Sequence, residues 1–112
     1  MEKFALLFRG GRTPYETTAA DLQSHMQKWL DWVTKLKNEG KYVSGEPLNK
    51  GGKFVSGANK AVTDGPFTEA KDIIGGFFIV NAASFDDAVK IAGVCPDYPF
   101  GGSVEIRQVM MM

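Results

Sequence analysis

The chain has 112 residues, 44% of them hydrophobic and 23% charged, which is typical of a single globular domain spanning residues 1–112. Thirteen lysines and arginines balance thirteen aspartates and glutamates, so no basic excess favours nucleic acid as a partner. The single cysteine excludes an internal disulfide, and neither a membrane-spanning run of roughly 20 apolar residues nor a signal peptide is recognisable, so we expect a cytoplasmic protein without membrane contact.

The first third of the chain predicts a strand followed by a long helix. Residues 4–8 alternate between two apolar faces, and Gly10–Gly11 ends this strand. A helix capped by Thr17 or Thr18 is predicted to run to about Glu39, with Gly40 as its stop. Its buried stripe is predicted from spacings of three and four residues to comprise Leu22, Met26, Trp29, Val33 and Leu36.

The middle of the chain predicts a hairpin and then a rigid turn. Residues 41–47 and a short return strand beginning at 54–55 are predicted to pair around a turn at 50–53. The segment Asp64-Gly65-Pro66-Phe67 follows, in which a fixed proline restricts the glycine before it. We expect this loop to place Asp64 and Phe67 at the rim of a site.

The last third predicts a strand, a helix, a loop and a final strand. Residues 77–80 are apolar on both faces, and Ser84 is predicted to cap a helix that ends at Gly93. Residues 95–102 predict a loop, because they contain two prolines and two glycines. The inward residues of the helix are predicted to be Phe85, Ala88, Val89 and Ala92, and the last strand spans 104–109.

The order of these elements predicts an α+β domain of the ferredoxin-like, split βαβ type with one extra strand. Two helices cover only one face of such a sheet, yet the strands at 4–8 and 77–80 are apolar on both faces. An exposed apolar sheet face usually marks an interface, and a second copy related by two-fold symmetry is the simplest partner. We therefore expect a homodimer whose two sheets enclose a cavity.

His25 is the only histidine, and helical geometry puts it at the edge of the predicted buried stripe. It is either an ordinary helix histidine with its polar tip at the surface, or a general acid or base. One histidine and scattered carboxylates give no metal-ligand spacing, so we expect no metal and no cofactor.

Two further charged positions have a structural and a functional interpretation. Asp64 either accepts backbone N–H groups in its turn or orients His25. In the last strand, Glu105 and Arg107 share a face opposite to that of Val104 and Ile106. They form either a salt bridge within the sheet or across a dimer, or a site where Arg107 receives an acidic ligand.

The sequence resembles the DGPF subgroup of the YCII-related family. The resemblance rests on Asp64-Gly65-Pro66-Phe67 with Glu69, Lys71 and Gly75-Gly76-Phe77-Phe78, and on the ending Gly102-Ser103-Val104-Glu105-Ile106-Arg107. It implies a dimeric α+β barrel, with a first-helix histidine and an aspartate proposed as an acid/base pair. His25 matches that histidine, and the aspartate corresponds either to Asp64 or to Asp97 in the loop after the second helix. Some relatives are dehalogenating or lactone-processing enzymes, and others are associated with extracytoplasmic-function sigma factors.

The sequence thus predicts a homodimer that binds a small, anionic molecule in its cleft. His25 and Asp64 are the predicted catalytic residues, and the predicted binding residues are Arg107, Phe67, Trp29 and Asp97. The alternative is a noncatalytic dimeric interaction module that serves a transcription regulator.

Overall fold

The chain forms two α-helices, six strands and one 3-10 turn within residues 1–11, 18–49, 51–64 and 73–112, which a computed structural model describes. In chain order these elements are β1 (Glu2–Arg9), α1 (Ala19–Asn38), β2 (Tyr42–Pro47), β3 (Lys53–Ser56), β4 (Ala61–Asp64), β5 (Ile74–Ala82), α2 (Phe85–Ala92), the turn η3 (Tyr98–Phe100) and β6 (Ser103–Gln108).

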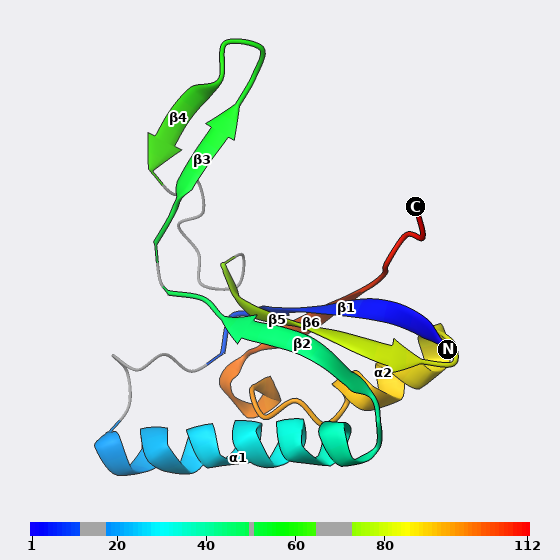
Figure 1. The fold of residues 1–112 in the computed structure, drawn as a ribbon. Helices are drawn as coiled ribbons and strands as arrows, with labels where there is room; N and C mark the ends of the chain where they lie inside the picture. Colours follow the sequence, from blue (N-terminus) through cyan, green and yellow to red (C-terminus); the bar gives the residue numbers. More distant parts are fainter. Residues whose placement is uncertain (12–17, 50, 65–72) are drawn as a thin grey trace.

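The main sheet has four antiparallel strands in the order β2-β5-β1-β6. Both helices lie on the same side of this sheet (Figure 1). With β3 and β4 set aside, the order strand, helix, strand, strand, helix, strand and the placing of the first strand in the sheet interior are those of the ferredoxin-like fold. The predicted α+β, split βαβ class is confirmed.

The predicted hairpin between residues 41–47 and the strand at 54–55 is wrong. Strand β2 pairs with β5, and this pairing continues beyond Pro47, because the Leu48 amide donates to the Gly75 carbonyl at 2.9 Å. Strand β3 instead pairs with β4 in a separate two-stranded sheet. This β3–β4 hairpin rises from the side of the main sheet opposite the helices (Figure 1), and Asp64 is the last residue of β4.

The predicted helix boundaries are confirmed by their caps. The Thr18 hydroxyl accepts from the Asp21 amide at 3.1 Å, and the Ser84 hydroxyl accepts from the Asp87 amide at 3.2 Å. At the other end of α1, Gly40 has a φ of +71°, and the Lys41 amide donates to the Leu36 carbonyl at 2.8 Å. This is a Schellman termination, for which glycine has the required left-handed freedom.

The buried stripe of α1 differs from the predicted one. Met26 is 54% exposed, whereas His25 is only 7% exposed and belongs to the buried face. The buried residues of α1 are His25, Trp32 and Leu36, with Trp29 and Val33 packed partly against the core. In α2 the same kind of correction applies, because Phe85 and Val89 are exposed while Ala88, Ile91 and Ala92 are buried.

The two faces of the main sheet follow the predicted alternation. In β1 the side chains of Phe4, Leu6 and Phe8 are buried in the core, while Ala5 and Leu7 are half-buried on the other face. That second face, here called the open face, continues across the sheet through Phe77 and Ile79 of β5, which pair with Leu7 and Ala5. No helix covers the open face in the described part of the chain, and none of the described helices is long and apolar enough to span a bilayer.

Candidate functional site

His25 and Asp97 form a buried pair between α1 and the loop that follows α2. The distance from His25 Nε2 to Asp97 Oδ1 is 2.6 Å, and the two side chains are 8% and 14% exposed. The two residues are 72 positions apart in the sequence. Of the two aspartates considered as partners of His25, Asp97 is therefore the one that contacts it in this chain.

Two contacts compete for the same nitrogen of His25. The Trp29 indole N–H points at Nε2 from 3.3 Å, and Asp97 Oδ1 lies at 2.6 Å from it. An indole only donates and a carboxylate only accepts, so Nε2 satisfies one of them at a time. The shorter contact is the charge-assisted one, which favours a proton on Nε2 that is donated to Asp97.

This assignment leaves Nδ1 as the acceptor nitrogen of the neutral ring. Within the described part of the chain, no hydrogen bond reaches Nδ1. A carboxylate that holds the Nε2 proton thus fixes the tautomer in which Nδ1 accepts a proton from elsewhere, the arrangement found in acid/base histidines.

Asp97 is held in place by the backbone of its own loop. It precedes the turn η3, and its carbonyl accepts from the amides of Phe100 at 2.9 Å and Gly102 at 3.0 Å. The Tyr98 hydroxyl donates to the Ala92 carbonyl at 2.8 Å and ties the same loop to the end of α2. Burial raises the pKa of Tyr98, so this hydroxyl keeps its proton as a donor.

Two aromatic side chains, those of Trp29 and Phe100, contact His25. The Phe100 ring meets the His25 ring edge-on, with centroids 5.2 Å apart, and the Trp29 ring packs edge-on against Phe8 at 4.9 Å. Trp29 was predicted to bind a ligand, and the structure places it beside His25. Phe100 was not predicted at all, because an aromatic residue in a loop rich in proline and glycine has no periodicity that would single it out.

The other predicted site residues do not join this pair. Asp64 lies at the end of the β3–β4 hairpin and forms an exposed ion pair with Lys53 of the neighbouring strand. The expected pairing of Asp64 with His25 is therefore not found. Phe67 lies outside the described residues.

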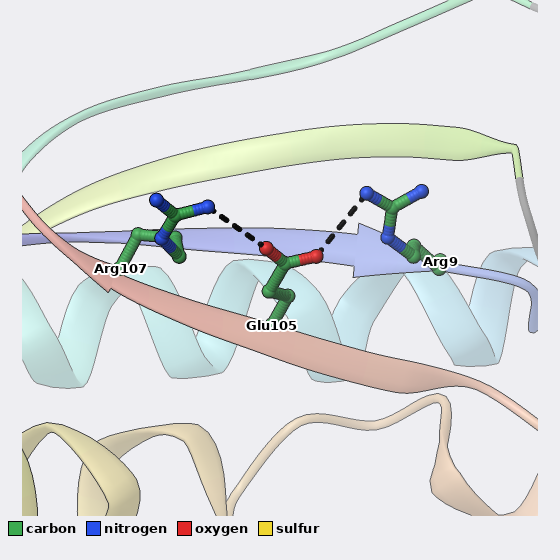
Figure 2. A network of polar contacts seen from close by, with 3 residues as sticks. All are labelled: Arg9, Glu105 and Arg107. Carbon is green, nitrogen blue, oxygen red and sulfur yellow. Dashed lines mark hydrogen bonds and ion pairs between the residues drawn. The ribbon is translucent and has the colours of Figure 1, made fainter.

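Arg107 is on the open face of the sheet, away from His25. Glu105 Oε2 lies 3.5 Å from Arg107 Nη1, and Glu105 Oε1 lies 3.2 Å from Arg9 Nη2 (Figure 2). The carboxylate thus stands between two guanidinium groups, as the salt-bridge interpretation requires. The Arg107 side chain is 71% exposed. Because the sheet separates Arg107 from the helices, it cannot share one small ligand with His25 in a single chain.

A comparison with known protein families identifies the family to which this chain belongs. The family described as the YCII-related domain matches residues 12–112, which is most of the chain. The chain belongs to the YCII-related family. No curated protein matches it.

One solved structure similar to this YCII-related chain is 5-chloro-2-hydroxyhydroquinone dehydrochlorinase (TftG) from Burkholderia phenoliruptrix AC1100, in complex with 2,5-dihydroxybenzoquinone. The alignment covers 96% of this chain and 93% of the other, with 20% sequence identity and a TM-score of 0.49.

Two surface hollows of the YCII-related chain lie away from the pair. One is a groove between α1 and α2 with a volume of about 150 Å³, floored by Trp32, Leu36 and Ile91. The other lies along the outer side of α1 between Ala20 and Lys28. Neither is lined by His25, Asp64 or Arg107, which were expected to share one cavity. Among the described residues, no group of three His, Cys, Asp or Glu side chains could hold a metal ion.

Cys95 lies near Asp97, in surroundings that disfavour the nucleophilic thiolate. It is buried, and burial raises the pKa of its thiol from 9.0 to about 11, with the Asp97 charge adding to the effect and a backbone hydrogen bond opposing it.

We expect an aromatic disulfide reagent at pH 8 to label Cys95 in the folded chain about 100-fold or more slowly than in the urea-unfolded chain, since each pKa unit is a tenfold change in thiolate. Equal rates would show that the thiol is accessible and ionisable.

The same shift gives a sign for the pH dependence of stability. The unfolded thiol ionises near pH 9 while the folded one stays neutral. The contribution of the buried, neutral Cys95 thiol to the free energy of unfolding is therefore complete below pH 9, and it is lost as the pH rises towards about 11.

Proposed function

We propose that this YCII-related protein is a homodimer that binds a small molecule and transfers a proton through His25, with Asp97 as the orienting carboxylate. The observation that carries the proposal is the 2.6 Å contact between His25 Nε2 and Asp97 Oδ1 in a largely buried setting. Asp97 replaces Asp64 in the catalytic role, because Asp64 contacts Lys53 on the projecting hairpin.

The chemistry follows from the tautomer. Neutral His25 accepts a proton at Nδ1 from a ligand with an acidic O–H or C–H group, and the resulting imidazolium is stabilised by the adjacent Asp97 carboxylate. The reverse transfer returns the proton from Nδ1 to the product. The Trp29 and Phe100 rings beside the imidazole favour a flat, partly apolar ligand.

The homodimer is supported by the open face. Its centre is apolar, with Ala5, Leu7, Phe77 and Ile79 adjacent to one another across β1 and β5. The charged network of Arg9, Glu105 and Arg107 borders this apolar centre along β6 and at the end of β1. An apolar centre with a charged rim is the usual composition of a protein interface.

The dimer is tested by a charge on the open face. Leu7 pairs with Glu105 in the ladder between β1 and β6, so Leu7→Glu brings two carboxylates side by side within the proposed interface. We expect the dissociation constant of the dimer to rise roughly 100-fold or more, measured by sedimentation equilibrium.

Val89→Glu is the matched control for this measurement. Val89 is 54% exposed on α2, on the other side of the sheet, and its replacement should leave the dimer intact. A wild-type chain that sediments as a stable monomer at micromolar concentration would contradict the homodimer.

The catalytic proposal is tested with a library of small phenols, hydroxyquinones and β-dicarbonyl acids. His25 is the only histidine, so its ring signals in an NMR spectrum report binding without assignment ambiguity. We expect a compound that shifts these signals to exchange its acidic proton with solvent deuterium faster in the presence of the protein. His25→Gln should abolish the acceleration, and a variant that retains it would refute the role of His25.

The noncatalytic dimeric module remains the second candidate, because of one observation. Both members of the pair are largely buried, so the same contact serves to fasten the loop after α2 onto α1. If no compound of the library shifts the His25 signals while the chain is a folded dimer, this structural role is favoured.

A further inference from the structure

Two glycines that are far apart in the sequence lie against Asp97: Gly11 beside its carboxylate, and Gly102 beside its Cβ and its backbone carbonyl. Gly11 follows β1 by two residues, and Gly102 immediately precedes β6. The two strands are neighbours, and Arg9 pairs with Ser103 at this end of the ladder. The pairing of the first and last strands therefore brings both glycines to the place where the loop after α2 presents Asp97.

Neither glycine has room for a larger residue. A Cβ atom on Gly11 would lie 2.5 Å from Asp97 Oδ2 and 2.7 Å from its Cγ, and one on Gly102 would lie 2.6 Å from the Asp97 Cβ and 2.9 Å from its carbonyl oxygen. Carbon atoms in proteins do not approach this closely without displacement of the neighbour.

At Gly11 the atoms that a Cβ would meet all belong to the Asp97 side chain, and at Gly102 the nearest one is the Asp97 Cβ. The Asp97 backbone cannot yield readily, because its carbonyl accepts two hydrogen bonds, from Phe100 and from Gly102. The carboxylate is held by His25 at Oδ1, and its Oδ2 is the atom that a Cβ on Gly11 would meet first. An added methyl group at Gly11 therefore pushes directly on the group that bonds to His25.

We infer that Gly11 and Gly102 are positioning residues that set Asp97 Oδ1 onto His25 Nε2. This inference rests on the proposed function, in which Asp97 fixes the imidazole tautomer. The inference concerns only how the Asp97 carboxylate is positioned. It lies where it does because Gly11 and Gly102 have no side chains, and not because a side chain at either position forms a hydrogen bond to it. The double glycines Gly10–Gly11 and Gly101–Gly102 then each have one member with this role.

The chain supplies matched controls for both substitutions. Gly11 has a φ of +86°, so Gly11→Ala combines backbone strain with the clash. Gly40 and Gly101 have φ values of +71° and +80°, and a Cβ on either meets nothing within 4 Å. Gly40→Ala and Gly101→Ala therefore have the strain without the clash. Gly102→Ala has the clash without a left-handed φ.

The experiment reads the tautomer of the single histidine from the ¹⁵N shifts of its two ring nitrogens in the whole 112-residue chain. We expect the wild type, Gly40→Ala and Gly101→Ala to show a protonated Nε2 and an acceptor Nδ1 at a pH where the ring is neutral. In Gly11→Ala and Gly102→Ala this difference between the nitrogens should shrink, because the two tautomers then interconvert. The inference would be overturned if Gly11→Ala and Gly102→Ala kept the wild-type pattern. It would also be overturned if Gly40→Ala and Gly101→Ala lost that pattern too.

A double-mutant cycle keeps the inference testable if Gly11→Ala and Gly102→Ala fold poorly. Asp97→Ala removes the two atoms that would lie nearest to a Cβ on Gly11, Oδ2 and Cγ. We expect Gly11→Ala to lower the melting temperature clearly more in the wild type than in the Asp97→Ala background, while Gly40→Ala has the same effect in both. Equal effects of Gly11→Ala in both backgrounds would overturn the inference. If Gly11→Ala destabilised the wild type more than the Asp97→Ala variant, but no ligand exchanged its proton faster with the protein present, the proposed function would be refuted. The positioning role of the two glycines would still hold.

Discussion

Replacing Asp97 with alanine should lower the free energy of unfolding by about 2–4 kcal/mol, because the substitution leaves a buried imidazole without its carboxylate. His25 is 7% exposed, so water does not readily take the place of Asp97 Oδ1. Urea unfolding followed by Trp29 and Trp32 fluorescence measures this loss. The His25 ring signals should change at the same time, since the acceptor that fixes the Nε2 proton is gone.

Asp64→Ala is the comparison that separates the two aspartates. Asp64 pairs with Lys53 on the hairpin, where both side chains are largely exposed. An exposed ion pair contributes little, so we expect a change within about 0.5 kcal/mol and unaltered His25 signals. If Asp64→Ala perturbed the histidine and Asp97→Ala did not, the pair described above would be the wrong one.

Replacing Phe78 with alanine should cost about 3–5 kcal/mol, the usual cost of removing a buried phenylalanine ring. Phe78 lies at the centre of an aromatic cluster between the sheet and α1. Its ring centroid is 4.9 Å from that of Phe8, 5.1 Å from that of Trp32 and 5.8 Å from that of Trp29. The cavity left by the substitution would remove one wall of the packing that holds Trp29, and through it the site.

Chemical unfolding measures this cost, and Phe85→Ala serves as its control. Phe85 makes one edge-on ring contact, with Phe4 at 5.0 Å, but is 49% exposed, so its truncation should cost about 1 kcal/mol. Phe78→Ala should also shift the His25 ring signals, whereas Phe85→Ala should not. Equal costs for the two variants would show that the aromatic cluster is not the centre of the core.

Local chemistry made the ferredoxin-like fold predictable from the sequence. Thr18 and Ser84 have a hydroxyl at the position where free helix amides need an acceptor, and Gly40 has the freedom that a Schellman ending needs. The alternation in β6 was correct as well, since Val104 and Ile106 pack on the core while Glu105 and Arg107 lie on the open face.

Long-range pairing was not predictable in the same way. The turn residues at 50–53 suggested that β2 folds back on the next strand, yet β2 pairs with β5, roughly thirty residues later. Turn chemistry indicates that a chain reverses but does not decide which strand is its neighbour. The β3–β4 hairpin was hidden for this reason, and with it the position of Asp64.

The site was half predictable. His25 was identified because it is the only imidazole, but it was placed at the edge of the helix stripe and Met26 inside it. Hydrophobicity favours methionine over histidine in a core, and this rule fails when a distant carboxylate satisfies the ring. Asp97 is such a carboxylate, and a separation of 72 residues leaves no trace in helical periodicity.

The order of the strands makes the His25–Asp97 pair a late product of folding. Strand β6 lies beside β1, although Arg9 of β1 and Glu105 of β6 are 96 positions apart in the sequence. Strands so far apart in sequence pair slowly, because the long loop between them loses chain entropy before the pairing stabilises it. The helix that carries His25 is local and can form first, so the imidazole waits for the strand pairing that brings Gly11 and Gly102 to Asp97.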